Sequence, residues 1–156
     1  MAEGKSSRSV PPRSAWGTYK TRTDVDLRYE YRKIAGKSLE EVGEFLIDSP
    51  SRLHHLLYAP DEVFNYYYLA VSDYLTGDSY ADDADVASCY LSAIKGRMAI
   101  RPETFKSNYP EIKLVLDTIA DRQKFYAADG NIYDSFSARR DEIDKLYQVY
   151  QAKVSG

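Results

Sequence analysis

The sequence predicts an all-α protein, in which a body resembling a four-helix bundle follows an extended basic N-terminal arm. Three observations predict this class: apolar residues recur at three- and four-residue spacing after residue 22, capping and glycine signals separate these stretches, and no convincing β-hairpin pattern occurs. The chain has 156 residues, enough for one ordinary domain. We therefore divide it into an arm, residues 1–22, and a helical domain, residues 23–156.

The arm is basic and lacks apolar periodicity. It carries five Lys or Arg residues against the single acid Glu3, and two glycines and two prolines interrupt any helix or strand. Such a segment cannot bury enough surface to fold alone, and fully extended it spans about 70 Å. We expect a polyanion or a neighbouring subunit to order it. A disordered tail with no role is the alternative.

Capping signals place two helices at the start of the helical domain. Thr23 and Asp24 can cap a helix that ends at Gly36. Ser38 and Glu41, three residues apart, predict a capping box that opens the second helix. The apolar faces of these helices are Leu27, Tyr31 and Ile34, then Leu39, Val42, Phe45 and Leu46.

Two longer helices are expected between residues 60 and 101. Pro60 suits the first turn of one of them, and Gly77 closes it. The acids that follow Gly77 suit the start of the next, because the helix dipole favours negative charge there. The apolar faces are Phe64, Tyr67, Tyr68, Val71 and Leu75, then Val86, Cys89, Tyr90, Ala93, Ile94 and Ile100.

The last third of the chain predicts two further helices after a connection framed by Pro102 and Pro110. One helix ends near Gly130, and the other begins at about Ile132. Their apolar residues are Ile112, Val115, Leu116, Ile119 and Tyr126, then Phe136, Ile143, Leu146, Tyr147 and Tyr150. The opposite side of the last helix is expected to be a solvated face, formed by Arg139, Arg140, Asp141, Glu142 and Lys145.

Charge is segregated along the chain. Residues 1–52 and 95–156 each carry a formal charge of +2, whereas residues 53–94 hold seven acids and no Lys or Arg. This acidic block also holds seven tyrosines, namely Tyr58, Tyr66, Tyr67, Tyr68, Tyr74, Tyr80 and Tyr90. An acidic, Tyr-rich surface suits the capture of a basic partner. The alternative, which we favour, is a solvated surface that keeps the protein soluble.

The sequence contains no recognisable catalytic or metal-binding motif. His54 and His55 point about 100° apart on a helix, so they are poorly placed to share a metal. The acids after Gly77 lack the spacing of a helix-loop-helix calcium loop, and no phosphate-binding loop, dinucleotide fingerprint or HExxH motif occurs. The single Cys89 indicates a buried, unreactive thiol. We therefore predict no enzymatic activity, no cofactor and no metal.

Two compositional features bear on the source of the protein and on its location. Asn, Gln and Met are scarce while charges are many, which is a weak indication of a thermophilic source. No stretch is apolar and long enough to span a membrane, and the N-terminus lacks the apolar core of a signal peptide.

Three short motifs carry a resemblance to a known family. The first consists of Met1, Ala2, Gly4, Lys5, Ser6, Arg8, Ser9 and Arg13. The second is the helix opening Pro50-Ser51-Arg52, and the third is the helix start Asn108-Tyr109-Pro110-Glu111-Ile112, in which Tyr109 separates the Asn from the Pro. In this order they resemble the major capsid (coat) proteins of rod-shaped and filamentous double-stranded DNA viruses of hyperthermophilic archaea, the rudivirus and lipothrixvirus group.

This resemblance implies a structural virion protein that wraps linear double-stranded DNA in an A-like form and self-assembles into a helical filament. Packaging must accept every genome sequence, so contacts are expected with phosphates and not with base edges. The residues expected to bind nucleic acid are Lys5, Ser6, Arg8, Ser9, Arg13, Lys20, Arg22, Arg28, Arg32 and Lys33.

The partners implied are the DNA duplex, other copies of the chain and, as in the filamentous branch, a second paralogous coat protein. The sequence leaves open whether the building block is a homodimer or a heterodimer, and whether a lipid envelope surrounds the filament. The expected location is the virion, assembled in the host cytoplasm. The alternative function is a non-enzymatic inhibitor or immunity-like protein that captures a basic partner with the acidic, Tyr-rich surface of residues 53–94.

Overall fold

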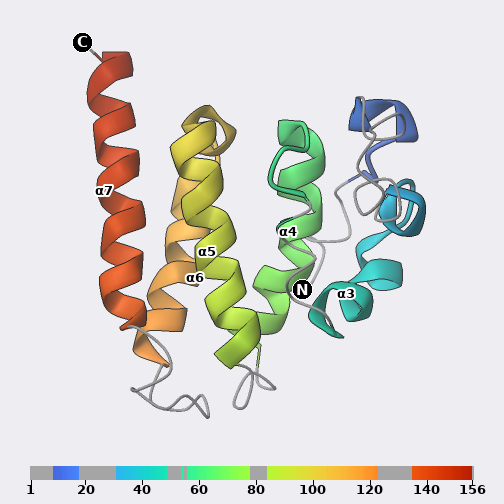
Figure 1. The fold of residues 1–156 in the computed structure, drawn as a ribbon, viewed down its shortest axis with the longest axis horizontal. Helices are drawn as coiled ribbons and strands as arrows, with labels where there is room; N and C mark the ends of the chain where they lie inside the picture. The colour runs from blue at the N-terminus through green and yellow to red at the C-terminus, as the bar shows by residue number, and fades with distance from the viewer. Residues whose placement is uncertain are drawn as a thin grey trace. The chain divides into compact units, whose positions relative to one another are not determined.

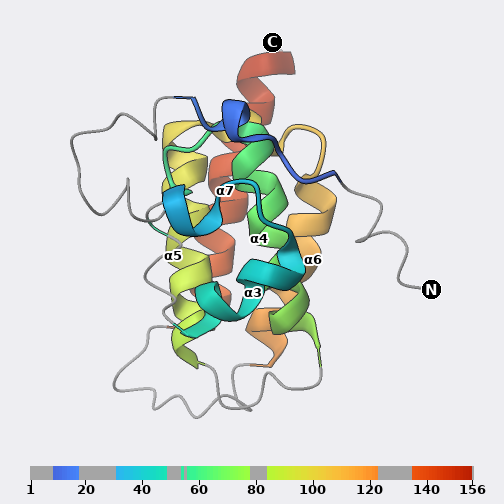
Figure 2. The ribbon, with the colours of Figure 1, turned by 90° about the vertical axis from the view of Figure 1, so that its right-hand side faces the viewer.

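The computed structural model describes residues 9–17, 31–48, 54, 56–77, 84–122 and 135–155. Within these ranges every regular element is helical and no residue lies in a β-strand, which confirms the all-α class. The elements are η1 (Arg13–Trp16), α3 (Leu39–Asp48), α4 (Asp61–Thr76), α5 (Ala84–Ile100), η4 (Pro102–Phe105), α6 (Tyr109–Asp121) and α7 (Phe136–Ser155) (Figures 1 and 2). None of the helices in the described ranges is long and apolar enough to cross a membrane.

The chain forms two compact units, Met1–Val71 and Ser72–Gly156, with the division inside α4. In the first unit, the helical turn at residues 31–34 ends at Gly36, as predicted. Gly36 has a φ of 78°, in the left-handed region that glycine adopts without steric cost. The amide of Lys37 then donates to the carbonyl of Ile34 at 3.0 Å and closes the turn.

A capping box opens α3, as the sequence predicts. The Ser38 amide donates to Oε1 of Glu41 at 2.8 Å, and the Glu41 amide donates to Oγ of Ser38 at 3.3 Å. These two bonds satisfy amide groups that the first turn of a helix leaves without a helical acceptor. Hydrogen bonds from the backbone and side chain of Ser38 hold the pKa of Glu41 below its usual value.

We predict that Ser38→Ala raises the pKa of Glu41 toward that of an ordinary glutamate, because the substitution removes the hydroxyl bond and loosens the turn. Since the folded-state pKa is lowered, the contribution of Glu41 to stability is present at neutral pH and is lost as the pH falls through that pKa. NMR titration of the Glu41 carboxyl measures the shift, with Glu41→Gln identifying the signal. An unchanged titration curve in Ser38→Ala would contradict the assignment.

The core of the first unit is rich in tyrosine. The predicted α4 face is confirmed, since Phe64, Tyr67, Tyr68 and Val71 are all buried. The hydroxyl of Tyr67 lies 3.0 Å from the carbonyl of Ile34 and 2.8 Å from that of Lys37, and it therefore ties α4 to the 31–37 segment. Pro60 lies one residue before α4, where its carbonyl accepts a hydrogen bond from the Phe64 amide at 2.9 Å.

In the second unit, α5 and α6 both pack against α7 (Figure 1). Lys95 of α5 pairs with Glu142, and Ser88 contacts Arg139, so α5 runs parallel to α7. Helix α6 runs antiparallel to α7. Its first residue, Tyr109, stacks on Tyr147, whereas Asp117, later in α6, pairs with the earlier residue Arg140. The predicted core residues that are buried here are Leu75, Val86, Tyr90, Ala93, Ile94, Ile112, Val115, Leu116, Ile119, Phe136, Ile143 and Tyr147.

Several expectations for the second unit differ from the structure. Ile100 is 51 % exposed at the end of α5, whereas Met98 is buried. The last helix begins at Phe136, and the Oγ of Ser135 accepts the Ala138 amide at 3.2 Å, as an N-cap does. The predicted features at Tyr126, Gly130 and Ile132 lie outside the described residues.

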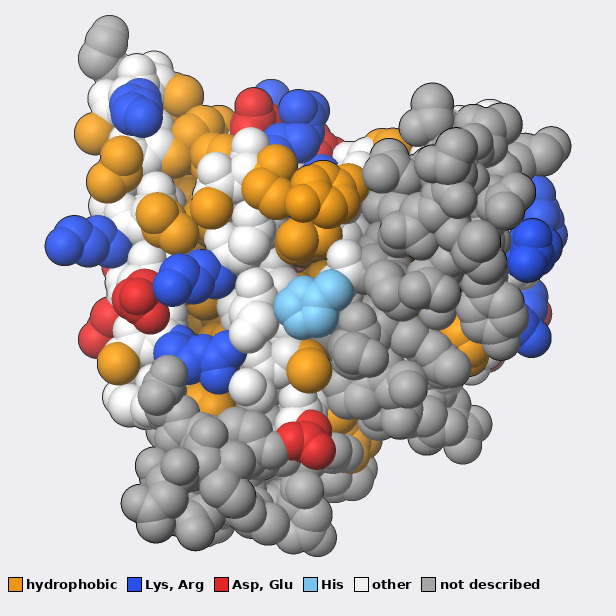
Figure 3. Space-filling model, viewed as in Figure 1, with side chains coloured by type: hydrophobic (Ala, Val, Ile, Leu, Met, Phe, Trp, Pro, Cys, Tyr) orange, Lys and Arg blue, Asp and Glu red, His pale blue; other side chains and the backbone are white. Residues whose placement is uncertain are grey.

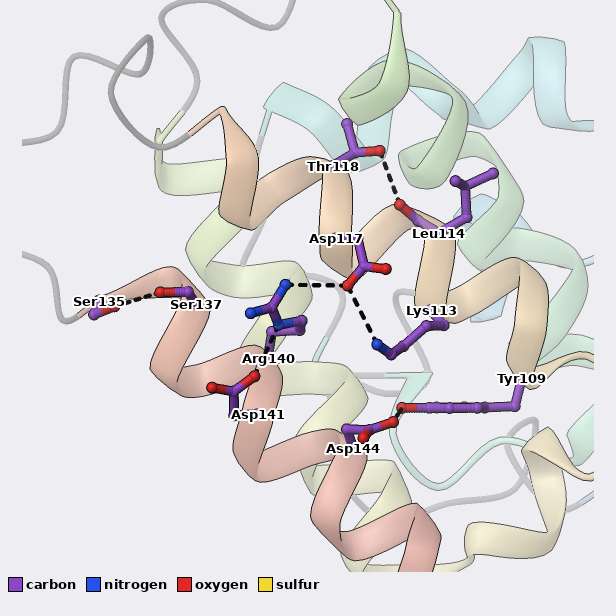
Figure 4. A network of polar contacts seen from close by, with 10 residues as sticks. All are labelled: Tyr109, Lys113, Leu114, Asp117, Thr118, Ser135, Ser137, Arg140, Asp141 and Asp144. Atoms are coloured by element: carbon purple, nitrogen blue, oxygen red, sulfur yellow. Dashed lines mark hydrogen bonds and ion pairs between the residues drawn. The ribbon is translucent and has the colours of Figure 1, made fainter.

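The predicted solvated face of the last helix is wrong at its two arginines. Arg139 donates to Oγ and to the carbonyl of Ser88, each at 2.9 Å, and to Oγ of Ser92 at 2.6 Å. Arg140 reaches α6 and pairs with Asp117 at 3.1 Å (Figure 4). Both side chains are half-buried, because an arginine stem packs on apolar surface while its head finds hydrogen-bond acceptors.

A buried arginine joins α5 to η4. Arg97 is 1 % exposed, and its Nε donates to Oγ1 of Thr104, which is also buried, at 2.8 Å. A hydrogen bond to a charged group in a dry site contributes more to stability than one at the surface, because its loss leaves a poorly solvated donor.

We predict that Thr104→Val lowers the free energy of unfolding by about 1.5–3 kcal/mol, because it removes the acceptor and keeps the side-chain volume. Thr104→Ser should retain most of the stability. The matched control is Thr118→Val, since that hydroxyl bonds only within its own helix at an exposed position. Urea denaturation measures the difference, and equal losses for Thr104→Val and Thr118→Val would refute the importance of this bond.

Candidate nucleic-acid interface

Four of the residues expected to bind nucleic acid lie within the described ranges. Ser9, Arg13, Arg32 and Lys33 are all exposed and all belong to the first unit. The other six, Lys5, Ser6, Arg8, Lys20, Arg22 and Arg28, lie outside the described residues. The candidate interface is therefore built from two segments, residues 9–17 and residues 31–39.

Trp16 holds the first segment to the body of the unit. It is fully buried, although the sequence places it in a segment expected to be extended. Its ring meets Tyr31 edge-on, with the centroids 5.5 Å apart and the planes at 86°, and lies 5.7 Å from Tyr67 of α4. Residues 13–16 accordingly form the short helix η1 and are not extended, because burying the indole requires the chain to turn toward the body.

The anchored segment places Arg13 over the turn that follows Arg32 and Lys33. A Cβ atom built on Gly36 would lie 3.3 Å from Nε and 3.5 Å from Cγ of Arg13. The arginine stem therefore crosses the surface of the turn at the point where a side chain is missing. Gly36 serves both the left-handed turn and this close approach.

The two segments together carry four cations and no acid. Besides Arg13, Arg32 and Lys33 they include Lys37, a half-buried residue that the sequence analysis did not single out. The sequence feature that could have identified Lys37 is its position within residues 31–39, a stretch that contains no acid. Such a surface attracts anions, and it can bind phosphates without reading a base sequence.

Most of the tyrosines of the acidic block that the structure describes are buried. Tyr66, Tyr67, Tyr68 and Tyr90 are buried, and of the described tyrosines in residues 53–94 only Tyr58, at 61 % exposure, is exposed. Tyr80 and the acids at positions 78, 82 and 83 lie outside the described residues.

The described residues show no group of three or more His, Cys, Asp or Glu side chains that could hold a metal ion. His54 is exposed, and His55 lies outside the described ranges. Cys89 is half-buried, and burial together with the nearby carboxylate of Asp85 raises the pKa of its thiol. A raised thiol pKa lowers the thiolate fraction at neutral pH and with it the reactivity of the thiol.

Comparison with known proteins adds no relative: no family model, no curated protein and no solved structure matches the chain. The assignment of a function therefore depends on the residues and their geometry.

We predict that Trp16→Ala lowers the free energy of unfolding by about 3–5 kcal/mol, because it leaves a large cavity between the two tyrosine rings. Trp16→Phe should lose less, since it retains an aromatic contact. Trp16 is the only tryptophan of the chain, so its fluorescence reports directly on this packing. An emission spectrum typical of a water-exposed indole in the folded wild type would contradict the burial of Trp16.

Proposed function

We propose that the chain is a structural virion protein that packages linear double-stranded DNA through sequence-independent phosphate contacts. The duplex is held in an A-like form, and copies of the protein assemble around it into a helical filament. This proposal adopts the function implied by the resemblance to coat proteins of archaeal rod-shaped and filamentous viruses. It places the protein in the virion, after assembly in the host cytoplasm.

The observation that carries the proposal is the acid-free, cationic pair of segments that Trp16 joins. Arg13, Arg32 and Lys33 are exposed on one unit, and neither segment contains an acidic residue. Duplex DNA attracts such a surface strongly because it carries one negative charge per roughly 1.7 Å of helix axis. Serine hydroxyls and backbone amides, as at Ser9, add neutral hydrogen bonds to phosphate oxygens.

The proposal requires contacts that tolerate any DNA sequence. Cations on flexible stems satisfy this requirement, because phosphates repeat regularly whatever the bases are. An A-form duplex has a wide, shallow minor groove, so a protein can follow its shape without reading base edges. The partners in this proposal are DNA, further copies of the chain, and in the filamentous branch a second paralogous coat protein.

We predict that Arg13→Gln, Arg32→Gln and Lys33→Gln, combined in the full chain, weaken binding to linear duplex DNA and make it less dependent on salt. Loss of three phosphate contacts should reduce the slope of log K against log salt by about three. The loss should be the same for DNA of different sequences. Fluorescence anisotropy across a salt series measures both quantities.

The matched control replaces Arg101, Lys106 and Lys145, three exposed cations of the second unit, with glutamine. It changes the net charge equally and should leave most of the affinity and slope intact. Equal effects of the two triple variants, or no DNA binding by the wild type at low salt, would disprove the proposed interface. Circular dichroism of the DNA tests the A-like form, and negative-stain microscopy with linear DNA tests filament formation.

The alternative, an inhibitor that captures a basic partner through residues 53–94, has less support. Its surface would depend mainly on acids among the described residues, because most of the described tyrosines of this block belong to the core. Charge reversal at Asp73 and Asp85 should abolish capture of a basic partner if this alternative holds, and should leave DNA binding intact if the packaging function holds.

A further inference from the structure

The side of α7 next to Lys95 of α5 carries a stripe of four residues with a regular order of charge. Glu142, Leu146, Val149 and Lys153 follow one another at steps of four, three and four residues, so they lie along one side of the helix. Glu142, Val149 and Lys153 are exposed, and Leu146 is half-buried. Val149 is 48 % exposed. We call these four residues the α7 stripe.

The α7 stripe is distinct from the side of α7 that forms the core. Phe136, Ile143 and Tyr147 face the core of the second unit and are buried. Beyond Tyr147, every residue from 148 to 155 is exposed except Tyr150, which is half-buried. In the last two turns of α7, both the side that continues the core face and the side that carries the α7 stripe are therefore exposed to solvent. Figure 3 shows hydrophobic, basic and acidic side chains interspersed along the α7 edge, with a basic one toward the C-terminal end.

The order of the stripe is complementary to itself in one orientation. When two copies of α7 lie antiparallel, Glu142 faces Lys153 of the partner subunit at one end, and the same pair repeats at the other end. Between these ion pairs, Leu146 faces the partner's Val149, and Val149 faces the partner's Leu146. This pattern is that of an isologous two-fold contact, in which one patch meets its own copy. A parallel arrangement would instead place Glu142 against the partner's Glu142, which is unfavourable.

We propose that the α7 stripe is a docking surface for α7 of a second copy of this chain, in an antiparallel two-fold contact. Glu142 already pairs with Lys95 of its own subunit at 3.2 Å, at a site where both side chains are about half exposed. An exposed carboxylate can accept a second cation, so this pair leaves room for the partner's Lys153. The charges select the orientation, and the apolar pair between them contributes the burial.

The size of the contact sets its strength. Residues 142–153 span about 18 Å of helix. Two helices that meet along this length bury an area at the small end of the range for specific interfaces. We therefore expect a weak dimer, with a dissociation constant on the order of micromolar or above. In a filament, many such contacts act together with other contacts of the same subunits, so a weak pairwise contact suffices.

The test uses charge reversal in the full chain without DNA. Glu142→Lys alone and Lys153→Glu alone each place like charges at both ends of the contact, and each should weaken dimerisation roughly tenfold or more. An equimolar mixture of the two variants should recover dimers, because every facing pair then joins Lys to Glu. The double variant Glu142→Lys/Lys153→Glu should recover them as well. Sedimentation velocity from micromolar to millimolar concentration measures all four samples.

Two further variants isolate the apolar part and the general effect of charge. Val149→Asp should abolish the dimer while leaving the far-UV circular dichroism spectrum of the monomer unchanged, because the side chain is already half exposed. Lys106→Glu, an equal charge change at an exposed position outside α7, should dimerise as the wild type does. A wild type that stays monomeric throughout, single reversals that dimerise normally, or a mixture that fails to recover would each overturn the proposal.

This inference deepens the proposed function and rests on it for its biological purpose, since a filament requires contacts between copies. The two can fail separately. If the α7 contact is wrong, the single reversals will dimerise as the wild type does, while DNA binding through Arg13, Arg32 and Lys33 is unaffected. If DNA packaging is wrong, the chain will not bind DNA, while the charge-swap pattern in sedimentation still holds.

Discussion

The packing of Trp16 between Tyr31 and Tyr67 is the interaction on which the candidate interface depends. Within residues 9–17 only Pro11 and Trp16 are buried, and the indole of Trp16 is the larger of these two side chains. The same Tyr67 fixes the other segment, because its hydroxyl bonds the carbonyls of Ile34 and Lys37. Burial raises the pKa of Tyr67 far above that of a free phenol, so this hydroxyl keeps its proton at any physiological pH. One aromatic cluster therefore positions both cationic segments.

Tyrosine serves a related purpose in the second unit. Tyr109 stacks on Tyr147 with ring centroids 3.8 Å apart, and its hydroxyl donates to the carboxylate of Asp144 at 2.7 Å (Figure 4). Tyr90 is fully buried, and its hydroxyl lies 3.0 Å from Oγ of Ser72. Each ring thus fills core volume while its polar tip finds a partner. Seven of the ten tyrosines that the structure describes are therefore core residues, and the number of tyrosines alone is no sign of a binding surface.

The features that the sequence predicted correctly are local ones. The capping box of Ser38 and Glu41 and the turn at Gly36 depend on residues within a few positions of each other, so their chemistry is legible in the order of the chain. The errors concern contacts between distant segments. Arg139 was expected in solvent because it is charged and was placed on the side of the helix opposite the apolar residues. Its hydrogen-bond acceptors, Ser88 and Ser92, lie about fifty positions earlier in the chain. The burial of Trp16 likewise requires partners that only the folded chain brings near.

The two proposed surfaces differ in how much geometric precision they require, and this difference accounts for where each lies. Phosphate contacts act over several ångströms and tolerate shifts of a flexible side chain, so short segments held by one aromatic cluster can supply them. A contact between copies must instead repeat with one register, because a shift along the helix would break both ion pairs at once. A straight helix of twenty residues such as α7 fixes the spacing of four side chains along about 18 Å. Cations anchored to a small tyrosine-lined core therefore suit a polyanion of any base sequence, and an ordered stripe on a long helix suits assembly with identical copies.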